Sequence, residues 1–333
     1  MFFKDMKRLF CMLVMTGITA IGANAQTEQN GQNEAFKHLD GALTLGTTGV
    51  GIEVATPMGN SMRLRAGASY MPRFDYNMTF GVQVGDDPST SSSKFERLSS
   101  MLESFTGSKV DDRIDMIGNP TYYNFNLLVD VMPFKNKHWH ITAGFYLGPS
   151  DIAKAYNKTE DMPSLMAVGI YNNMYNKLHG KSAWELTEVK LIDLGPGYED
   201  VGSDLEMLMT LQEKFDRWGR MGIHLGDRKD GSAYMMEPDE NLMVKARMKA
   251  NSFKPYIGFG YGGRLLKNSD RYQVSFDCGM MFWGGKPDVL THDGTNLITD
   301  VDNVGGKVGD YIKIIKKFDV FPVLNVKLSR RLF

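Results

Sequence analysis

The amino-acid sequence predicts an all-β protein, an antiparallel transmembrane β-barrel of about eight strands with helical insertions in its long loops. Three observations favour this fold class. The chain begins with an export signal, it contains unusually long stretches in which apolar and polar residues alternate, and it sets two long loops among several short turns.

The bulk composition removes two classes of protein. The 333 residues contain 38 Lys and Arg against 39 Asp and Glu, so the chain has no basic excess of the kind that nucleic-acid binding requires, and no nucleic acid is expected as a partner. Apart from the N-terminus, no apolar run approaches the roughly 20 residues of a membrane helix. A bundle of membrane helices is therefore also excluded.

Residues 1–25 have the three parts of a cleaved secretory signal peptide. Basic residues come first, an apolar stretch follows from residue 9 to 22, and Ala23-Asn24-Ala25 provides the small residues of a cleavage site. The alternative is a buried N-terminal helix. Cleavage after Ala25 would leave Cys278 as the only cysteine, which excludes an internal disulfide.

The strand signal is strongest between residues 62 and 84, where apolar residues occupy nearly every even position and polar residues or glycine most odd ones. Side chains of a strand alternate between two faces, and this stretch far exceeds the length of a usual soluble strand. The pattern recurs at 121–133, 138–148, 242–249, 253–264, 272–282 and 324–329. A soluble β-sandwich is the alternative, but glycine is frequent on the polar face and aromatic residues lie near strand ends, which favours a membrane barrel.

The strand count leaves two possibilities. Seven strands follow residue 57 and one precedes it, while the short turns call for an earlier strand around Leu39–Leu45 that turns at Gly46–Gly49. The final strand also calls for a partner within residues 285–318. Eight strands are predicted and ten are the alternative, since single-chain barrels have even numbers.

Residues 86–119 and 149–240 are long insertions, which in this class lie outside the cell. Capping-box spacings at Ser93-x-x-Glu96 and Ser203-x-x-Glu206 predict helices, and a further helix is expected over 163–178. The predicted organisation is a signal peptide (1–25), an N-terminal segment (26–41) and a barrel (42–333) carrying these two insertions as a helical cap or plug.

The chain resembles the outer-membrane β-barrel proteins of Gram-negative bacteria, particularly small barrels of the OmpA or OmpW type. The resemblance covers most of residues 42–333 and rests on the strand pattern, the strand Lys254–Gly262 and the C-terminal Phe333. It implies integral outer-membrane location, contact with outer-membrane lipid, and recognition of Phe333 as an assembly signal by the barrel-assembly machinery. Phe333 departs from the usual pattern because the alternation places it on the same face of its strand as the polar residues.

Ten charged residues lie on the predicted lumen face: Glu53, Arg63, Arg65, Asp130, Lys245, Arg247, Lys249, Arg264, Asp277 and Lys327. An eight-stranded barrel has room only for its own side chains or one small ligand, so these charges should pair and fill the lumen. The alternative is a narrow porin-like channel in which the basic group at 245–264 attracts anions.

Few residues carry a catalytic or metal-binding signal. His138 and His140, with Asp130 on the adjoining strand, are weak metal candidates, and a hydrogen-bonded cluster is the preferred interpretation. Gly258-x-Gly260-x-Gly262 lies within an alternating strand, where glycine keeps one face small rather than binding a nucleotide. No catalytic residue and no cofactor is predicted.

We therefore expect a barrel with a structural or partner-binding role, in which the large loops bind an unknown extracellular or envelope partner. A solute channel is the alternative, and an enzyme at the membrane rim ranks third.

Overall fold

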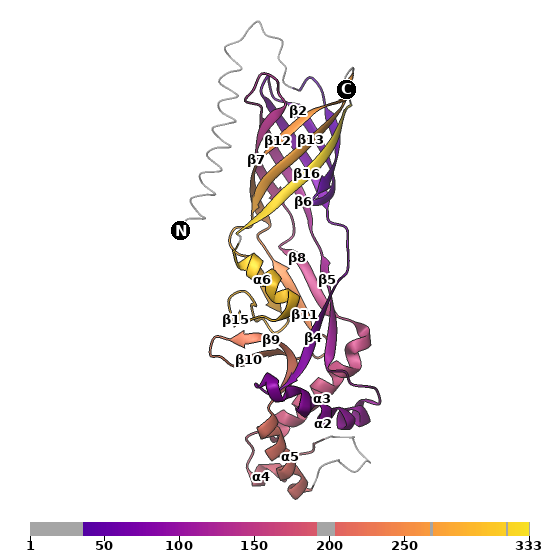
Figure 1. Cartoon of the computed structure of the whole chain (residues 1–333), viewed down its shortest axis with the longest axis vertical. Helices are drawn as coiled ribbons and strands as arrows, with labels where there is room; N and C mark the ends of the chain where they lie inside the picture. The colour runs from indigo at the N-terminus through magenta and orange to yellow at the C-terminus, as the bar shows by residue number, and fades with distance from the viewer. Residues whose placement is uncertain (1–35, 192–203, 267–268, 318, 333) are drawn as a thin grey trace.

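The structure, a computed structural model, describes residues 36–191, 204–266, 269–317 and 319–332. The predicted signal peptide and Phe333 lie outside the described residues. Two β-sheets build the molecule: a closed barrel at one end and an open sheet with helices at the other (Figure 1).

The barrel is closed and antiparallel and has eight strands, which confirms the predicted fold class. Because β1 pairs with both β2 and β16, Asp40 lies opposite both Ala55 and Arg331 and the sheet has no free edge. In order around the barrel the strands are β1 (Asp40–Gly46), β16 (Val320–Arg331), β13 (Ser269–Phe282), β12 (Phe253–Leu266), β7 (Trp139–Leu147), β6 (Tyr123–Val131), β3 (Met62–Tyr70) and β2 (Gly49–Pro57).

Alternation along the barrel strands points apolar side chains outward and polar side chains inward. On β2, for example, Ile52 is 65% exposed whereas its neighbour Glu53 is 6% exposed. Large apolar side chains are exposed on all eight strands: Leu43, Leu45, Val50, Ile52, Val54, Tyr70, Tyr123, Phe125, Leu127, Val131, Trp139, Ile141, Leu147, Ile257, Phe259, Tyr261, Phe276, Met280, Leu324, Val326 and Leu328. We call these residues the apolar belt.

The open sheet belongs to what we call the distal domain, residues 71–122, 148–252 and 283–319, which the chain reaches in three excursions from the barrel. The strand order is β10 (Ala233–Met236), β9 (Met221–Arg228), β4 (Tyr76–Val84), β5 (Arg113–Pro120), β8 (Asp151–Asn157), β11 (Lys245–Lys249) and β14 (Asp288–Thr291). A short strand, β15 (Val301–Asp302), also pairs with β9.

Helices pack against this sheet and form the main apolar core of the molecule with it. They are α2 (Pro88–Thr106), α3 (Met162–Leu178), α4 (Ala183–Leu186), α5 (Leu205–Trp218) and α6 (Gly306–Lys317), with a 3-10 turn at Thr159–Asp161. Within the described residues, no helix is both long and apolar enough to cross a membrane.

The helix expected over 163–178 is confirmed as α3, but the capping box predicted at Ser93 is wrong. Helix α2 begins earlier, where Asp87 accepts a hydrogen bond from the Ser89 backbone, and Ser93 lies inside the helix. Ser203 of the second predicted box lies outside the described residues, and Asp204 caps α5. An aspartate carboxylate accepts the free N–H groups of a first helical turn as well as a serine does, so spacing alone did not identify the cap.

Two strands that the alternation assigned to the barrel belong to the distal domain. Residues 62–84 form β3 and β4, separated by a break that contains Pro72, and only β3 is in the barrel. Residues 242–249 contain β11 of the open sheet, whereas the strand required near residues 39–45 is confirmed as β1. A half-buried strand of any antiparallel sheet alternates with the same period, so alternation alone does not distinguish lipid from a helix as the apolar neighbour.

Candidate functional site: the barrel interior

Six of the ten charged residues predicted for the lumen face come together inside the barrel. They are Glu53 on β2, Arg63 and Arg65 on β3, Asp130 on β6, Asp277 on β13 and Lys327 on β16. Five of the six are buried, and Arg63 retains a side-chain exposure of 20%. Three acids therefore face three bases in an enclosed space.

Arg65 lies at the centre of this group, which we call the lumen network. Its Nη1 donates to Oδ2 of Asp277 at 2.7 Å, and its Nε lies 3.4 Å from Oδ1 of Asp130 and 3.5 Å from Oε1 of Glu53. One guanidinium thus contacts carboxylates from three other strands. A planar group with five N–H donors is suited to this role, and lysine would not reproduce it.

Asp277 has three partners in the lumen. Besides Arg65, it lies 3.4 Å from Nζ of Lys327 and 2.8 Å from Nε2 of His140. Lys327 also reaches Glu53 at 3.2 Å. A buried carboxylate is tolerated only when paired charges and hydrogen bonds replace water, and these contacts provide them.

Asp130 completes the network on the opposite wall. Arg63 donates to its Oδ2 from Nε at 3.0 Å and from Nη2 at 2.7 Å, and the Thr142 hydroxyl donates to its Oδ1 at 2.8 Å. The network therefore spans the lumen from β3 and β6 to β13 and β16.

Glycine makes room for this packing. A Cβ atom at Gly260 would collide with His140 and with Asp277, and one at Gly258 or Gly279 would collide with the Tyr256 hydroxyl. The alternating glycines of β12 therefore serve the close approach of lumen side chains.

A second, apolar layer closes the barrel mouth that adjoins the distal domain. The Trp283 ring stacks on Phe321 with centroids 5.6 Å apart, and Phe321 in turn lies 6.1 Å from Tyr122. The buried members of this mouth cluster are Tyr122, Leu128, Tyr146, Ile152, Tyr256, Met281, Trp283 and Val323.

Lys254 is a lumen residue that the sequence-based selection missed. It is fully buried beside the mouth cluster, with Nζ 5.5 Å from the Tyr122 ring centre and 3.5 Å from the Ser252 carbonyl. Lys254 occupies an even position of β12, and the even positions of this strand face the lumen. The alternation alone therefore predicts that its side chain points inward.

Four of the ten charges predicted for the lumen do not join the lumen network. Lys245, Arg247 and Lys249 lie on β11 of the distal domain, where Lys245 pairs with Asp239 at 2.7 Å. Arg264 lies on an exposed part of β12. The basic group that suggested anion selectivity therefore does not line the barrel.

The two histidines do not form a metal site with Asp130. His140 points into the lumen network, whereas His138 is exposed and its Nδ1 lies 2.9 Å from the Gly262 carbonyl. In the part of the chain that the structure describes, no three His, Cys, Asp or Glu side chains gather as metal ligands would.

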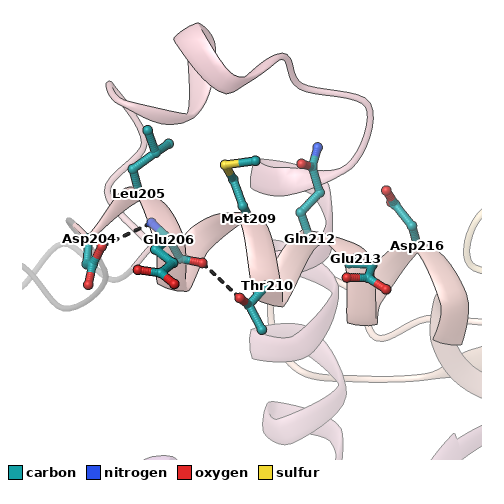
Figure 2. Close-up of a pocket in the computed structure, with 8 residues that line it drawn as sticks. All are labelled: Asp204, Leu205, Glu206, Met209, Thr210, Gln212, Glu213 and Asp216. Atoms are coloured by element: carbon teal, nitrogen blue, oxygen red, sulfur yellow. Dashed lines mark hydrogen bonds between the residues drawn. The ribbon is translucent and has the colours of Figure 1, made fainter.

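A pocket of about 820 Å³ lies at the far tip of the distal domain along α5. Figure 2 shows Leu205, Met209 and Gln212 on one side of the helix. Two acidic residues that line this pocket already have partners. Glu213 forms an ion pair with Arg217, and Oδ1 of Asp216 lies 2.6 Å from Nδ1 of His179.

Comparison with known proteins gives similarity only at low identity. No protein family and no curated protein matches the sequence. Among solved structures, Acinetobacter baumannii CarO2 is 14% identical, with 90% of this chain and 100% of that chain covered and a TM-score of 0.36. Acinetobacter baumannii CarO is 15% identical over 87% of this chain and 96% of that chain, with a TM-score of 0.33.

A major outer membrane protein from Thermus thermophilus is 10% identical, covers 89% of this chain and 98% of its own, and gives a TM-score of 0.26. With TM-scores this low, none of the three supports an argument about function.

Proposed function

We propose that the protein is an integral outer-membrane barrel with a closed lumen, whose role is to anchor the distal domain and present it to a partner outside the cell. The apolar belt carries the membrane part of this proposal. Soluble proteins rarely expose a continuous apolar surface, whereas a lipid-facing barrel must.

The dimensions of the belt support the same conclusion. Strands β3, β6 and β7 each have nine residues. At about 3.3 Å per residue and a tilt near 40°, nine residues span about 23 Å, close to the apolar height of an outer-membrane barrel. Tyr70 and Tyr123 at one end, and Trp139 and Tyr261 at the other, occupy the places of interfacial aromatic girdles.

The lumen network supports the closed state. A channel needs a continuous polar path, but here three acids and three bases pair across the interior and an apolar cluster covers the mouth. A solute would have to separate buried ion pairs to pass. The solute-channel alternative is therefore disfavoured.

Chain connections support the placement of the distal domain outside. The turns between β2 and β3, and between β6 and β7, are short and lie at the barrel end opposite the distal domain, as does the end of β16 (Figure 1). All three long connections leave the barrel at the end that adjoins the distal domain, and the long loops of such barrels face the outside. An exposed Trp184 (76%) and exposed Met207 and Met209 near the far tip give that domain an apolar surface for a partner.

Site-directed labelling tests this arrangement in cells. We would place a single cysteine at Trp184→Cys or at Lys135→Cys in a Cys278→Ser background and treat intact cells with a membrane-impermeant maleimide. We expect labelling at position 184 in intact cells, and labelling at position 135 only after the outer membrane is permeabilised. Labelling at 135 alone in intact cells would invert the proposed topology, and equal labelling at both would contradict membrane integration.

A further inference from the structure

The outer wall of the barrel is interrupted by a groove of about 490 Å³ across β1, β2, β3 and β6. Its apolar side chains are Leu43, Val50, Ile52, Ala68, Tyr70, Tyr123 and Phe125. The groove lies inside the apolar belt, at the end of the barrel that adjoins the distal domain.

Strand register explains why the surface is hollow here. Ala68 lies between Ile52 on β2 and Phe125 on β6, which are its direct cross-strand neighbours. In the next layer Ala66 lies between Val54 and Leu127 in the same way. Ala68 is the small residue among these larger side chains that lines the groove.

Two tyrosines line the groove at the end nearer the distal domain. The layer beyond Ala68 contains Tyr70, which lies opposite Val50 on one side and Tyr123 on the other. Both tyrosines are 49% exposed. A tyrosine with an apolar ring and a polar hydroxyl is suited to the boundary between hydrocarbon and headgroups.

We propose that this groove holds one acyl chain of a phosphorylated lipid from the leaflet that adjoins the distal domain, a proposal that rests on the membrane placement above. The walls of the groove are apolar, which suits the hydrocarbon of an acyl chain. Its continuity with the apolar belt identifies the occupant as lipid rather than a water-soluble ligand.

Arg73 is the residue that would bind the phosphate of this lipid. It follows Tyr70 by three residues, is exposed, and forms no ion pair within the described part of the chain. Planar guanidinium groups bind phosphate through paired hydrogen bonds. The chain in the groove and a phosphate beyond the tyrosines would then belong to one lipid molecule.

The test is retention of lipid by the full mature chain, refolded into nanodiscs of phosphatidylethanolamine and phosphatidylglycerol, transferred to mild detergent and weighed by native mass spectrometry. Ala68→Phe fills the groove. Ala143→Phe is the matched control, because Ala143 is also an outward-facing alanine of the barrel wall but lies between Ile141 and Phe145 on its own strand. Arg73→Gln removes the phosphate contact.

We expect one retained phospholipid on the wild type and on Ala143→Phe, its loss from Ala68→Phe, and weaker retention by Arg73→Gln. Equal retention by Ala68→Phe and the wild type would overturn the groove as a site. Unchanged retention by Arg73→Gln would overturn the phosphate contact. A dimer that only Ala68→Phe disrupts would identify a second copy as the occupant and overturn the lipid.

Failure of the wild type to enter nanodiscs would instead contradict the proposed membrane placement. Heat-modifiable gel mobility of each variant shows that its barrel has formed, so a lost lipid cannot be mistaken for a lost fold.

Discussion

Asp277 shows how a single buried carboxylate can hold several strands together. Arg65, His140 and Lys327 all reach it from other strands, and each would lose one of its acceptors if the carboxylate were removed. Removing one partner of a buried ion pair is far more costly than removing one at the surface, because the remaining charge stays buried without compensation.

We expect Asp277→Ala to lower the free energy of unfolding by about 3 to 5 kcal/mol. Urea unfolding of the refolded protein in lipid, followed by tryptophan fluorescence, measures the change. Asp111→Ala is the control, since Asp111 forms an exposed ion pair with Lys109 and its loss should leave the transition in place. Equal effects of the two substitutions would show that the lumen network does not stabilise the barrel.

Tyr234 gives a pH-dependent prediction in the distal domain. The side chain is buried and bonded to Thr291 and Asp293, and burial raises the pKa of its hydroxyl to about 12. An unfolded tyrosine has a pKa of about 10, so the folded state holds this proton more tightly. The resulting stabilisation is present below pH 10 and is lost as the pH rises towards 12.

We therefore expect Tyr234→Phe to be less stable than the wild type at neutral pH, because two hydrogen bonds are lost. The difference should narrow by about 2 kcal/mol between pH 10 and 12, since only the wild type loses this protonation-linked stability there. Thermal unfolding at a series of pH values measures both. A difference that stays constant across this range would contradict the assignment.

At the scale of strands, the outward residues of the barrel distinguish lipid from water as their neighbour. Phe259 is 53% exposed on β12 within the apolar belt, whereas Trp184 is 76% exposed on α4 of the distal domain. A charge at the lipid midplane of a barrel costs about 2 to 4 kcal/mol, while a charge on a water-exposed surface costs little.

We expect Phe259→Arg to lower the fraction of protein that folds into lipid vesicles, and Trp184→Arg to leave it unchanged. Heat-modifiable gel mobility after refolding gives both fractions. Should Phe259→Arg fold into vesicles as efficiently as the wild type, the apolar belt would not be the lipid-facing surface.

Some elements followed from the sequence and others did not, for identifiable reasons. The parity change at Gly46–Gly49 correctly required the hairpin of β1 and β2, because a two-residue turn fixes the register of both strands. By contrast, β4 and β11 alternate as barrel strands do, yet β4 packs its apolar side chains into the core of the distal domain and Met248 of β11 packs against the mouth cluster. Periodicity reports that one face is buried, and the neighbour that buries it is set by contacts distant in sequence.

Alternation likewise predicted which charges point into the lumen, but not how they pair in the lumen network. Six inward charges were predictable from alternation on barrel strands. The four that do not join the lumen network lie on β11 or at an exposed part of β12. Lys254 and His140 had the correct parity. Their partners, Tyr122 and Asp277, come from parts of the chain that only the closed barrel brings near.

At the scale of the whole molecule, the chain is divided between the barrel and the distal domain. Every excursion that leaves the mouth of the barrel contributes to the distal domain, including residues 283–319, which the sequence did not assign to it. The mouth cluster joins the two parts, with Trp283 and Phe321, at either end of the third excursion, packed over the lumen. The fold is thus that of an anchored domain on a filled barrel.

The central claim is that this barrel spans a membrane without conducting. Single-channel recording of the refolded mature protein in a planar bilayer tests it most directly, with heat-modifiable mobility and vesicle co-flotation showing that a barrel has inserted. We expect inserted protein to give no stable conductance steps, because the lumen network and the mouth cluster fill the interior. Stable steps from the inserted wild type would contradict the closed lumen and make the protein a channel.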